Sequence, residues 1–243
     1  MMQAMIFAAG LGTRLKPLTE KVPKALIEVG GMTLLERVVL KLKAAGVQRM
    51  VINVHHFSER VIRFIRAKDN FGMEVIISDE SSCLLDTGGG IKKAGHAFDP
   101  QSPVLLHNVD ILSNADLRAF YSQNLTNDAT LLVSNRDTKR YLLFDNDMNL
   151  VGWTHLGTGE IRSPYPRLNI DKCRRYAFSG IHLFSPRLLK LMDNFPEKFG
   201  IMDFYLSVCH QTNIRGSLQE GLQLIDVGKI DTLKEAEQLF CRL

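Results

Sequence analysis

Short apolar runs recur along the first half of this chain, separated by segments with apolar residues at helical spacing. The runs have the length of buried strands and occur at residues 5–9, 50–54, 74–77, 103–107 and 129–134. The segments between them are typical of helices and occur at residues 33–46, 58–67, 86–94 and 113–123. This strand–helix alternation predicts an α/β fold, with a mainly parallel, doubly wound sheet flanked by helices.

Several predicted helices begin at residues of the kind that cap helix N-termini. Residues 33–36 and 113–116 have the spacing of capping boxes. Ser58 is expected to cap the second helix, and Asp231 a C-terminal helix that runs to about Cys241. These positions give the expected starts of four helices.

Strands dominate the pattern after residue 134. A hairpin is expected from the apolar runs 141–144 and 150–153, and the polar residues 155–175 are expected to form a loop. Further along the chain we expect a strand at 176–184, a short helix from Ser185, a helix at 202–210 and a strand at 222–225. Because no repeat or linker interrupts the sequence, we expect one domain over residues 1–243. A β-rich part, residues 135–220, is inserted before the chain returns to the sheet.

Composition and charge narrow the functional classes. The chain is 45% hydrophobic and 23% charged, which is typical of a globular domain. A net charge of +4 with no run of Lys or Arg suits an anionic small molecule and argues against a nucleic-acid partner. The apolar runs are far shorter than the ~20 residues of a membrane helix, so no membrane partner is expected. The four cysteines form no Cys-x-x-Cys pair, so we expect reduced thiols in a cytoplasmic protein.

The first loop has the features of a phosphate-binding site. The strand over residues 5–9 ends at Gly10-Leu11-Gly12, and cationic residues follow in a stretch that includes Arg14 and Lys24. Backbone N–H groups in such a turn can bind an anion, and the cations neutralise its charge. The loop fits neither the dinucleotide fingerprint, because Leu15 stands where a third small residue is needed, nor the P-loop, because Lys24 follows a proline.

Two aspartates each follow an apolar strand, Asp110 near the middle of the chain and Asp226 near its end. In open α/β sheets, ligands bind beyond the carboxyl ends of the strands, so both carboxylates could reach one cation. Mg²⁺ is the natural candidate, because it takes one or two carboxylates and completes its shell with phosphate oxygens and water. The alternative is that they are turn or capping residues. The neighbouring His55 and His56 point in different directions, which favours ordinary loop histidines over metal ligands.

Three glycines follow Asp86 and Thr87 at the start of the helix over residues 86–94. Their N–H groups carry no neighbouring side chain, which suits a base or ribose lying against the backbone. A flexible surface turn is the alternative interpretation.

These motifs together resemble the signature of the sugar-phosphate nucleotidyltransferases. The resemblance is carried by GLGTR at 10–14, PLT at 17–19, PK at 23–24, DTGGGI at 86–91, NVD at 108–110, FSGI at 178–181 and DVG at 226–228. The most similar branch is the short, single-domain one, with N-acetylmuramate 1-phosphate uridylyltransferases and proteins labelled mannose-1-phosphate guanylyltransferase. Two departures stand beside the aspartates, Val109 in place of a small residue and Lys229 in place of a threonine.

The resemblance implies a Rossmann-like (GT-A-like) fold and a role for each motif. A nucleotide-binding half would span residues 1–134 and a sugar-binding half residues 135–220, with the returning strand and C-terminal helix at 221–243. The nucleotide would be bound by Ala8, Ala9, Gly10, Gly12, Thr13, Arg14, Thr87 and Gly88. The sugar phosphate would be bound by Lys24, Ser179 and Gly180. Mg²⁺ would be held by Asp110 and Asp226, and the catalytic residues would be Arg14, Lys24 and Asp110.

The implied reaction joins a nucleoside triphosphate to a sugar 1-phosphate and releases pyrophosphate. The sugar phosphate is largely dianionic near pH 7, so it can attack the α-phosphorus without a general base. The glycine-rich stretch favours UTP. GTP with mannose or heptose phosphate is the alternative, and a cytidylyltransferase acting on phosphocholine is more distant. A non-catalytic nucleotide-sensing subunit is also more distant, because Arg14, Lys24 and both aspartates are present. A nicotinamide oxidoreductase is disfavoured by the failed fingerprint.

Overall fold

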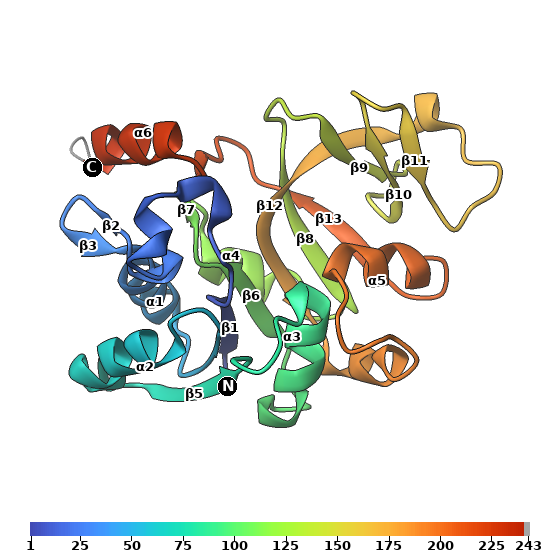
Figure 1. Cartoon of the computed structure of the whole chain (residues 1–243). Coiled ribbons are helices and arrows are strands. Elements are labelled where there is room, and N and C mark those ends of the chain that lie inside the picture. The colour runs from blue at the N-terminus through green and yellow to red at the C-terminus, as the bar shows by residue number, and fades with distance from the viewer. Residues whose placement is uncertain (241–243) are drawn as a thin grey trace.

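Helices and strands alternate through the first half of the chain, and strands dominate the second half (Figure 1). This computed structural model describes the backbone of residues 1–240 and the side chains of residues 1–237. Its α-helices are α1 (Leu34–Ala45), α2 (Ser58–Ala67), α3 (Asp86–Ala94), α4 (Leu117–Ser122), α5 (Ile201–Val208) and α6 (Ile230–Phe240). Its strands are β1 (Gln3–Phe7), β2 (Glu28–Val29), β3 (Met32–Thr33), β4 (Arg49–Val54), β5 (Glu74–Asp79), β6 (Val104–Asn108), β7 (Ile111–Ser113), β8 (Ala129–Ser134), β9 (Arg140–Phe144), β10 (Leu150–His155), β11 (Glu160–Arg162), β12 (Arg174–Phe184), β13 (Ile214–Leu218) and β14 (Leu224–Asp226).

The central element is a ten-stranded mixed sheet. Strand β1 pairs in parallel with β4 on one side and β6 on the other, and β5 continues the parallel part beyond β4. Beyond β6 the direction changes, because β12 pairs antiparallel with β6, β8 and β9. The α/β, Rossmann-like prediction is therefore confirmed, with the parallel strands concentrated in the first half of the chain.

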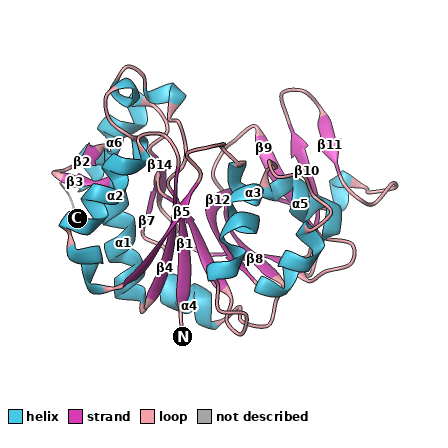
Figure 2. Cartoon of the chain, turned by 60° about the horizontal axis from the view of Figure 1, so that its bottom comes forward, coloured by secondary structure: helices cyan, strands magenta, loops and turns pink. Residues whose placement is uncertain are grey.

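Both faces of the parallel strands are covered by helices, as Figure 2 shows. Strand β1 is buried at every position, and its side chains alternate between two apolar clusters. Ala4 and Ile6 join the cluster that contains the apolar faces of α1 and α2, whereas Met5 and Phe7 join the one that contains those of α3 and α5. This two-sided burial explains why the strands read as continuous apolar runs rather than as alternating patterns.

One of the predicted helix starts is confirmed, and others are wrong. Thr33 caps α1 as expected, because its hydroxyl oxygen accepts a hydrogen bond from the Glu36 N–H at 3.1 Å. The capping box predicted at 113–116 is wrong, since Ser113 ends β7 and the cap of α4 is Asp116. Ser58 is the first residue of α2 rather than its cap, and Phe57 precedes it in the left-handed region.

The start of α6 also differs from the prediction. Asp231 lies in its first turn, and Lys229 stands at the capping position. The Lys229 N–H donates to the Thr232 hydroxyl oxygen at 3.2 Å, and that hydroxyl donates back to the Lys229 carbonyl at 2.9 Å. The expected end of this helix near Cys241 lies outside the described residues.

Two expectations for the second half of the chain need correction. The polar residues 155–175 are not a simple loop, because Glu160–Arg162 forms β11 and pairs with β10. The strand near residue 224 does not return to the main sheet. It forms a separate two-stranded ribbon with β7, in which Asp226 pairs with Ile111. Within the described part of the chain, no helix has the combined length and apolar character that crossing a bilayer requires.

Candidate active site

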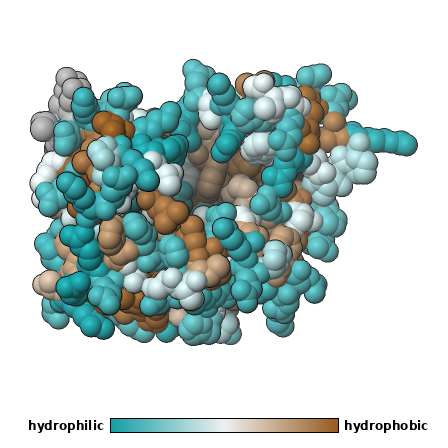
Figure 3. Space-filling model, viewed as in Figure 1, coloured by the Kyte–Doolittle hydropathy of each residue, from teal (hydrophilic) through white to brown (hydrophobic). Residues whose placement is uncertain are grey.

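A hollow opens between the two halves of the molecule on the face shown in Figure 3, with an apolar floor and a largely hydrophilic rim. It contains two cavities. The larger has a volume of about 960 Å³ and is lined by Arg14 and Asp226 on one side and by residues of β9, β10 and β11 on the other. The smaller has a volume of about 380 Å³ and is lined by Lys24 and Asp110 together with residues around the carboxyl ends of β1, β4 and β6.

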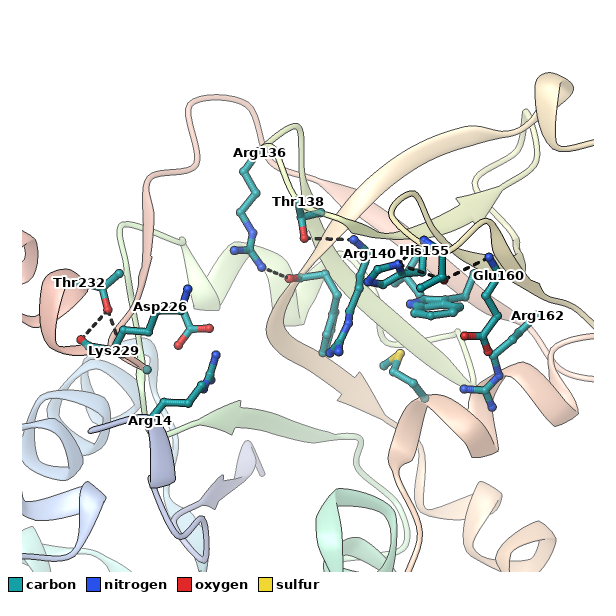
Figure 4. A pocket seen from close by; sticks show the side chains of 16 residues that line it. Arg14, Arg136, Thr138, Arg140, His155, Glu160, Arg162, Asp226, Lys229 and Thr232 are labelled. Carbon is teal, nitrogen blue, oxygen red and sulfur yellow. Dashed lines mark hydrogen bonds between the residues drawn. The ribbon is translucent and has the colours of Figure 1, made fainter. Parts of the chain in front are cut away.

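A tight turn holds the first loop at this hollow. Gly12 has a φ of 63°, and a Cβ at this position would lie 2.7 Å from Thr19 Cγ2. The Thr19 hydroxyl donates to the Gly12 carbonyl at 2.9 Å, which ties the two ends of the loop together. Arg14 lies in the short 3₁₀ turn that follows, and Figure 4 shows its side chain at the cavity beside Asp226. Its guanidinium can therefore meet an anion bound there.

Lys24 and Asp110 form an ion pair between two segments that are far apart in the sequence. Lys24 begins a short 3₁₀ turn after Pro23, and Asp110 lies between β6 and β7. The two side chains are only 11% and 16% exposed, so their charges are weakly screened by solvent. Both line the smaller cavity.

Asp226 is held beside Asp110 by the ribbon of β7 and β14. The Val227 N–H donates to the Asp110 carbonyl at 2.8 Å, directly after Asp226. The pKa of the Asp226 carboxyl is raised above its ordinary value by burial and, to a smaller extent, by the charge of Asp110. Three cations oppose this rise, namely Lys24, Arg14 and Arg136. The two carboxylates therefore feel each other's charge, as a pair that shares one cation would.

The donor set fits a hard divalent cation whose shell is completed by the substrate. The Asp226 Oδ1 atom is buried and accepts no hydrogen bond from any described residue. Among the described residues no three or more His, Cys, Asp or Glu side chains gather around a common point, so an all-protein metal cage is absent there. Mg²⁺ matches two carboxylates with phosphate and water oxygens in the remaining positions. His55 bonds the Glu80 carbonyl at 2.6 Å through Nδ1, as a loop histidine would.

The backbone residues predicted to contact the nucleotide lie in different surroundings. Ala9 and Gly10 line the smaller cavity. The Ala8 N–H is already used, because it donates to the Asn53 side-chain oxygen at 2.8 Å. Gly12 and Thr13 line neither cavity, although they shape the turn that presents Arg14.

The glycine-rich start of α3 is packed against the segment that precedes α5. Thr87 lines the smaller cavity. The Gly88 N–H donates to the Phe199 carbonyl at 2.9 Å, and a Cβ at Gly88 would lie 2.3 Å from the Phe199 ring. The interpretation of these glycines as bare N–H groups open to a base therefore does not hold for Gly88. Their small size instead allows two backbone segments to approach closely.

Ser179 and Gly180 lie behind the cavity wall rather than on it. Both residues are buried, neither lines either cavity, and the Ser179 hydroxyl has no described hydrogen-bond partner. Gly180 has a φ of 71°, and a Cβ there would lie 2.9 Å from the Asn108 side-chain nitrogen. The register of β12 against β8 shifts here, so this glycine allows the strand to bend.

Several cavity residues carried no motif in the sequence. Asn53 and Glu80 are buried at the ends of β4 and β5, and the Asn53 amide donates to Glu80 Oε1 at 2.7 Å. Asn53 could have been noticed, because it is a polar residue inside an otherwise apolar run. Arg136, Arg140 and Trp153 line the larger cavity from the β-rich part of the chain. Their spacing gave no signal, since the fold rather than the sequence brings them together.

Comparison with known proteins places this architecture in one family. The family profile described as "Nucleotidyl transferase" matches residues 3–241. An N-acetylmuramate alpha-1-phosphate uridylyltransferase from Neisseria meningitidis serogroup B is 28% identical, with 98% of each chain aligned. The enzyme of the same name from Caulobacter vibrioides is 46% identical over 109 residues, which are 44% of this chain and 45% of that one.

A solved structure shares the fold. The inositol-1-phosphate CTP transferase from T. maritima superposes with a TM-score of 0.78 over 100% of this chain and 96% of that one, at 16% identity. The match of the family profile to almost the whole chain carries the assignment. The chain therefore belongs to the nucleotidyl transferase family, as its resemblance to the sugar-phosphate nucleotidyltransferases predicts, and is an enzyme of that class.

Proposed function

We propose that this enzyme joins UTP to a sugar 1-phosphate in a Mg²⁺-dependent reaction that releases pyrophosphate. The observation that carries the proposal is the meeting of Asp110, Asp226 and Arg14 at one hollow, with Lys24 paired to Asp110. Acidic side chains and cations in such proximity suit a metal-bound polyphosphate better than a neutral ligand, because each anionic group has a partner of opposite sign.

Each residue has a distinct part in this proposal. Arg14 would bind the β- and γ-phosphates, because its planar guanidinium matches two phosphate oxygens. Lys24 would leave Asp110 when the metal arrives and would lie between the α-phosphate and the sugar phosphate. Asp110 and Asp226 would hold Mg²⁺, which when bound would neutralise charge on the phosphates and order them.

The chemistry then depends on position and charge rather than on a proton acceptor. An oxygen of the sugar phosphate dianion attacks the α-phosphorus and forms a new P–O bond. The bond between the α-phosphorus and the bridging oxygen breaks, and pyrophosphate leaves with its electron pair. The barrier is raised by repulsion between the two anions, so Arg14 and Lys24 lower it by compensating their charge.

The proposal of UTP over the other nucleotides has two supports. A relative that aligns with 98% of the chain is named a uridylyltransferase. The stretch DTGGGI at 86–91 also resembles the corresponding stretch of that branch. The alternative is a guanylyltransferase that joins GTP to a mannose or heptose phosphate.

A grid of substrates tests the proposal. The purified protein would be incubated with each of four nucleoside triphosphates and with sugar 1-phosphates of different classes, and pyrophosphate release would be measured with and without Mg²⁺. We expect Mg²⁺-dependent release that requires both substrates and is fastest with UTP. A preference for GTP would reassign the base, and the absence of release in every combination would contradict the catalytic role.

A further inference from the structure

The wall of the larger cavity opposite Arg14 is basic. Arg136, Arg140 and Arg162 line it together with His155, and they come from the segment between β8 and β9 and from β9, β10 and β11. Figure 4 shows Arg140 and Arg162 on the side of the cavity away from Arg14, with Arg136 between the two sides. The site therefore has a second group of cations besides those that would meet the phosphates.

These arginines differ in how their charge is used. Arg162 is paired with Asp203 at 2.6 Å. Arg136 donates to the Phe178 carbonyl at 3.0 Å and lies close enough to Asp226 to lower the pKa of that carboxyl. Arg140 forms no ion pair with a described carboxylate, although Glu160 lines the same cavity. Of the three arginines, Arg140 is therefore the one whose side chain has neither an ion pair nor a hydrogen bond among the described residues.

The wall also offers apolar contact beside its charge. Trp153 lines the cavity, and the Arg162 guanidinium lies 5.8 Å from the centre of its ring. Phe178 and Met202 line it as well. A ring with a polar face and an apolar face, as a sugar has, can pack on such a surface while an attached anion reaches the arginine.

We propose that this wall selects sugar 1-phosphates that carry a carboxylate on the sugar, and that Arg140 binds that carboxylate. The inference rests on the proposed function. The reason is charge: the phosphate groups would be matched by Arg14, Lys24 and the metal, whereas a neutral sugar would leave the exposed Arg140 guanidinium with only water as a partner. A carboxylate accepts two parallel hydrogen bonds from a guanidinium, which gives both energy and orientation.

The test compares acidic sugar phosphates with neutral counterparts of similar size, so that the effect of charge is separated from the effect of size. N-acetylmuramate 1-phosphate would be compared with the derivative in which its carboxylate is a primary amide, and glucuronate 1-phosphate with glucose 1-phosphate. The dissociation constant of each compound would be measured by calorimetry, and kcat/KM with UTP from pyrophosphate release. We expect the acid of at least one pair to bind about ten-fold more tightly than its neutral partner, and Arg140→Gln to reduce that ratio to about one.

Arg66→Gln serves as the control, because Arg66 is exposed in the last turn of α2 and lines neither cavity. It should keep the wild-type ratio. Equal binding of acid and neutral compound in both pairs would overturn the inference, as would a ratio that Arg140→Gln leaves unchanged. The binding measurement needs no turnover, so a failure of catalysis, which concerns the proposed function, is distinguishable from a failure of the carboxylate site.

Discussion

The pairing of Lys24 with Asp110 couples the first loop to the carboxyl end of the central sheet. These residues are 86 positions apart, and both side chains are mostly buried. Each charge is compensated by the other, so removing one would leave the other without its partner at low exposure. Such losses are costly when the remaining charge is desolvated. An amide in place of the carboxylate keeps its shape and an oxygen that can accept a hydrogen bond from Lys24, so it is the substitution that best separates an effect on catalysis from one on folding.

Replacing Asp110 by Asn tests the metal role at the residue scale. The amide keeps the shape of the side chain but loses the negative charge that Mg²⁺ requires, so we expect turnover to fall by about 100-fold or more while the protein stays folded. Pyrophosphate release at saturating Mg²⁺ and thermal unfolding would be measured together. Asp193→Asn, at an exposed aspartate outside both cavities, should change neither. A near-normal rate for Asp110→Asn would exclude the residue as a metal ligand.

The sequence predicted site residues best where position along a strand dictated their placement. Asp110 and Asp226 both follow apolar runs, and the structure brings them together. Ser179 could not be placed in the same way, because its burial depends on the bend of β12 at Gly180. The basic wall with Arg140 could not be predicted from the sequence for a related reason. Only the tertiary fold brings β9, β10 and β11 opposite the first loop.

At the element scale, local hydrogen bonding explains both the correct and the wrong helix starts. Thr33 was predictable because the next residues are free to form α1. Thr33 is itself paired in a ribbon, with Glu28, yet α1 begins directly after it. Ser113 pairs with Leu224 in the other ribbon, but α4 begins only at Leu117, which leaves Asp116 to cap it. A partner strand more than 100 residues away is beyond the reach of a four-residue motif.

The packing of α3 predicts how its glycines respond to substitution. A Cβ at Gly88 would meet both the ring and the carbonyl oxygen of Phe199, so Gly88→Ala should destabilise the fold by roughly 1–3 kcal/mol through overpacking. Gly10→Ala is the matched control for stability, because nothing lies within 4 Å of its Cβ position. Urea unfolding of both variants would measure the difference. Equal stability of the two variants would contradict the packing role of Gly88.

At the scale of the whole molecule, the change from parallel to antiparallel pairing gives the site its two sides. The parallel strands end at the first loop, and β12 passes from β6 to β9 and so joins this part to the basic wall. The periodicity of the sequence predicted the parallel part, because its strands are buried on both faces. It did not predict how β12 spans the two parts, since pairing with three partners leaves no mark on the pattern of a single strand.

Two buried histidines where these parts join predict acid sensitivity of the whole fold. Burial lowers the pKa of His107 from 6.5 to about 4 and that of His182 from 6.5 to about 3. Between pH 6.5 and pH 4, both histidines therefore become protonated in the unfolded chain but stay mostly neutral in the folded protein. The unfolded chain therefore binds more protons between pH 6.5 and pH 4. Stability should decrease as pH falls through this range, by about 1.4 kcal/mol per pH unit for each histidine.

Replacing His182 by Phe isolates its share of this effect. Its ring packs between Phe7, at 6.3 Å between centroids, and Tyr205, at 5.6 Å, and neither ring nitrogen has a described hydrogen-bond partner. A phenyl ring would keep the packing and remove the titrating group, so the slope of unfolding free energy against pH should become shallower by about one proton. His210→Gln, at an exposed histidine, should leave the slope unchanged. If His182→Phe kept the wild-type slope between pH 4 and 6.5, burial of this histidine would not be the source of the acid sensitivity.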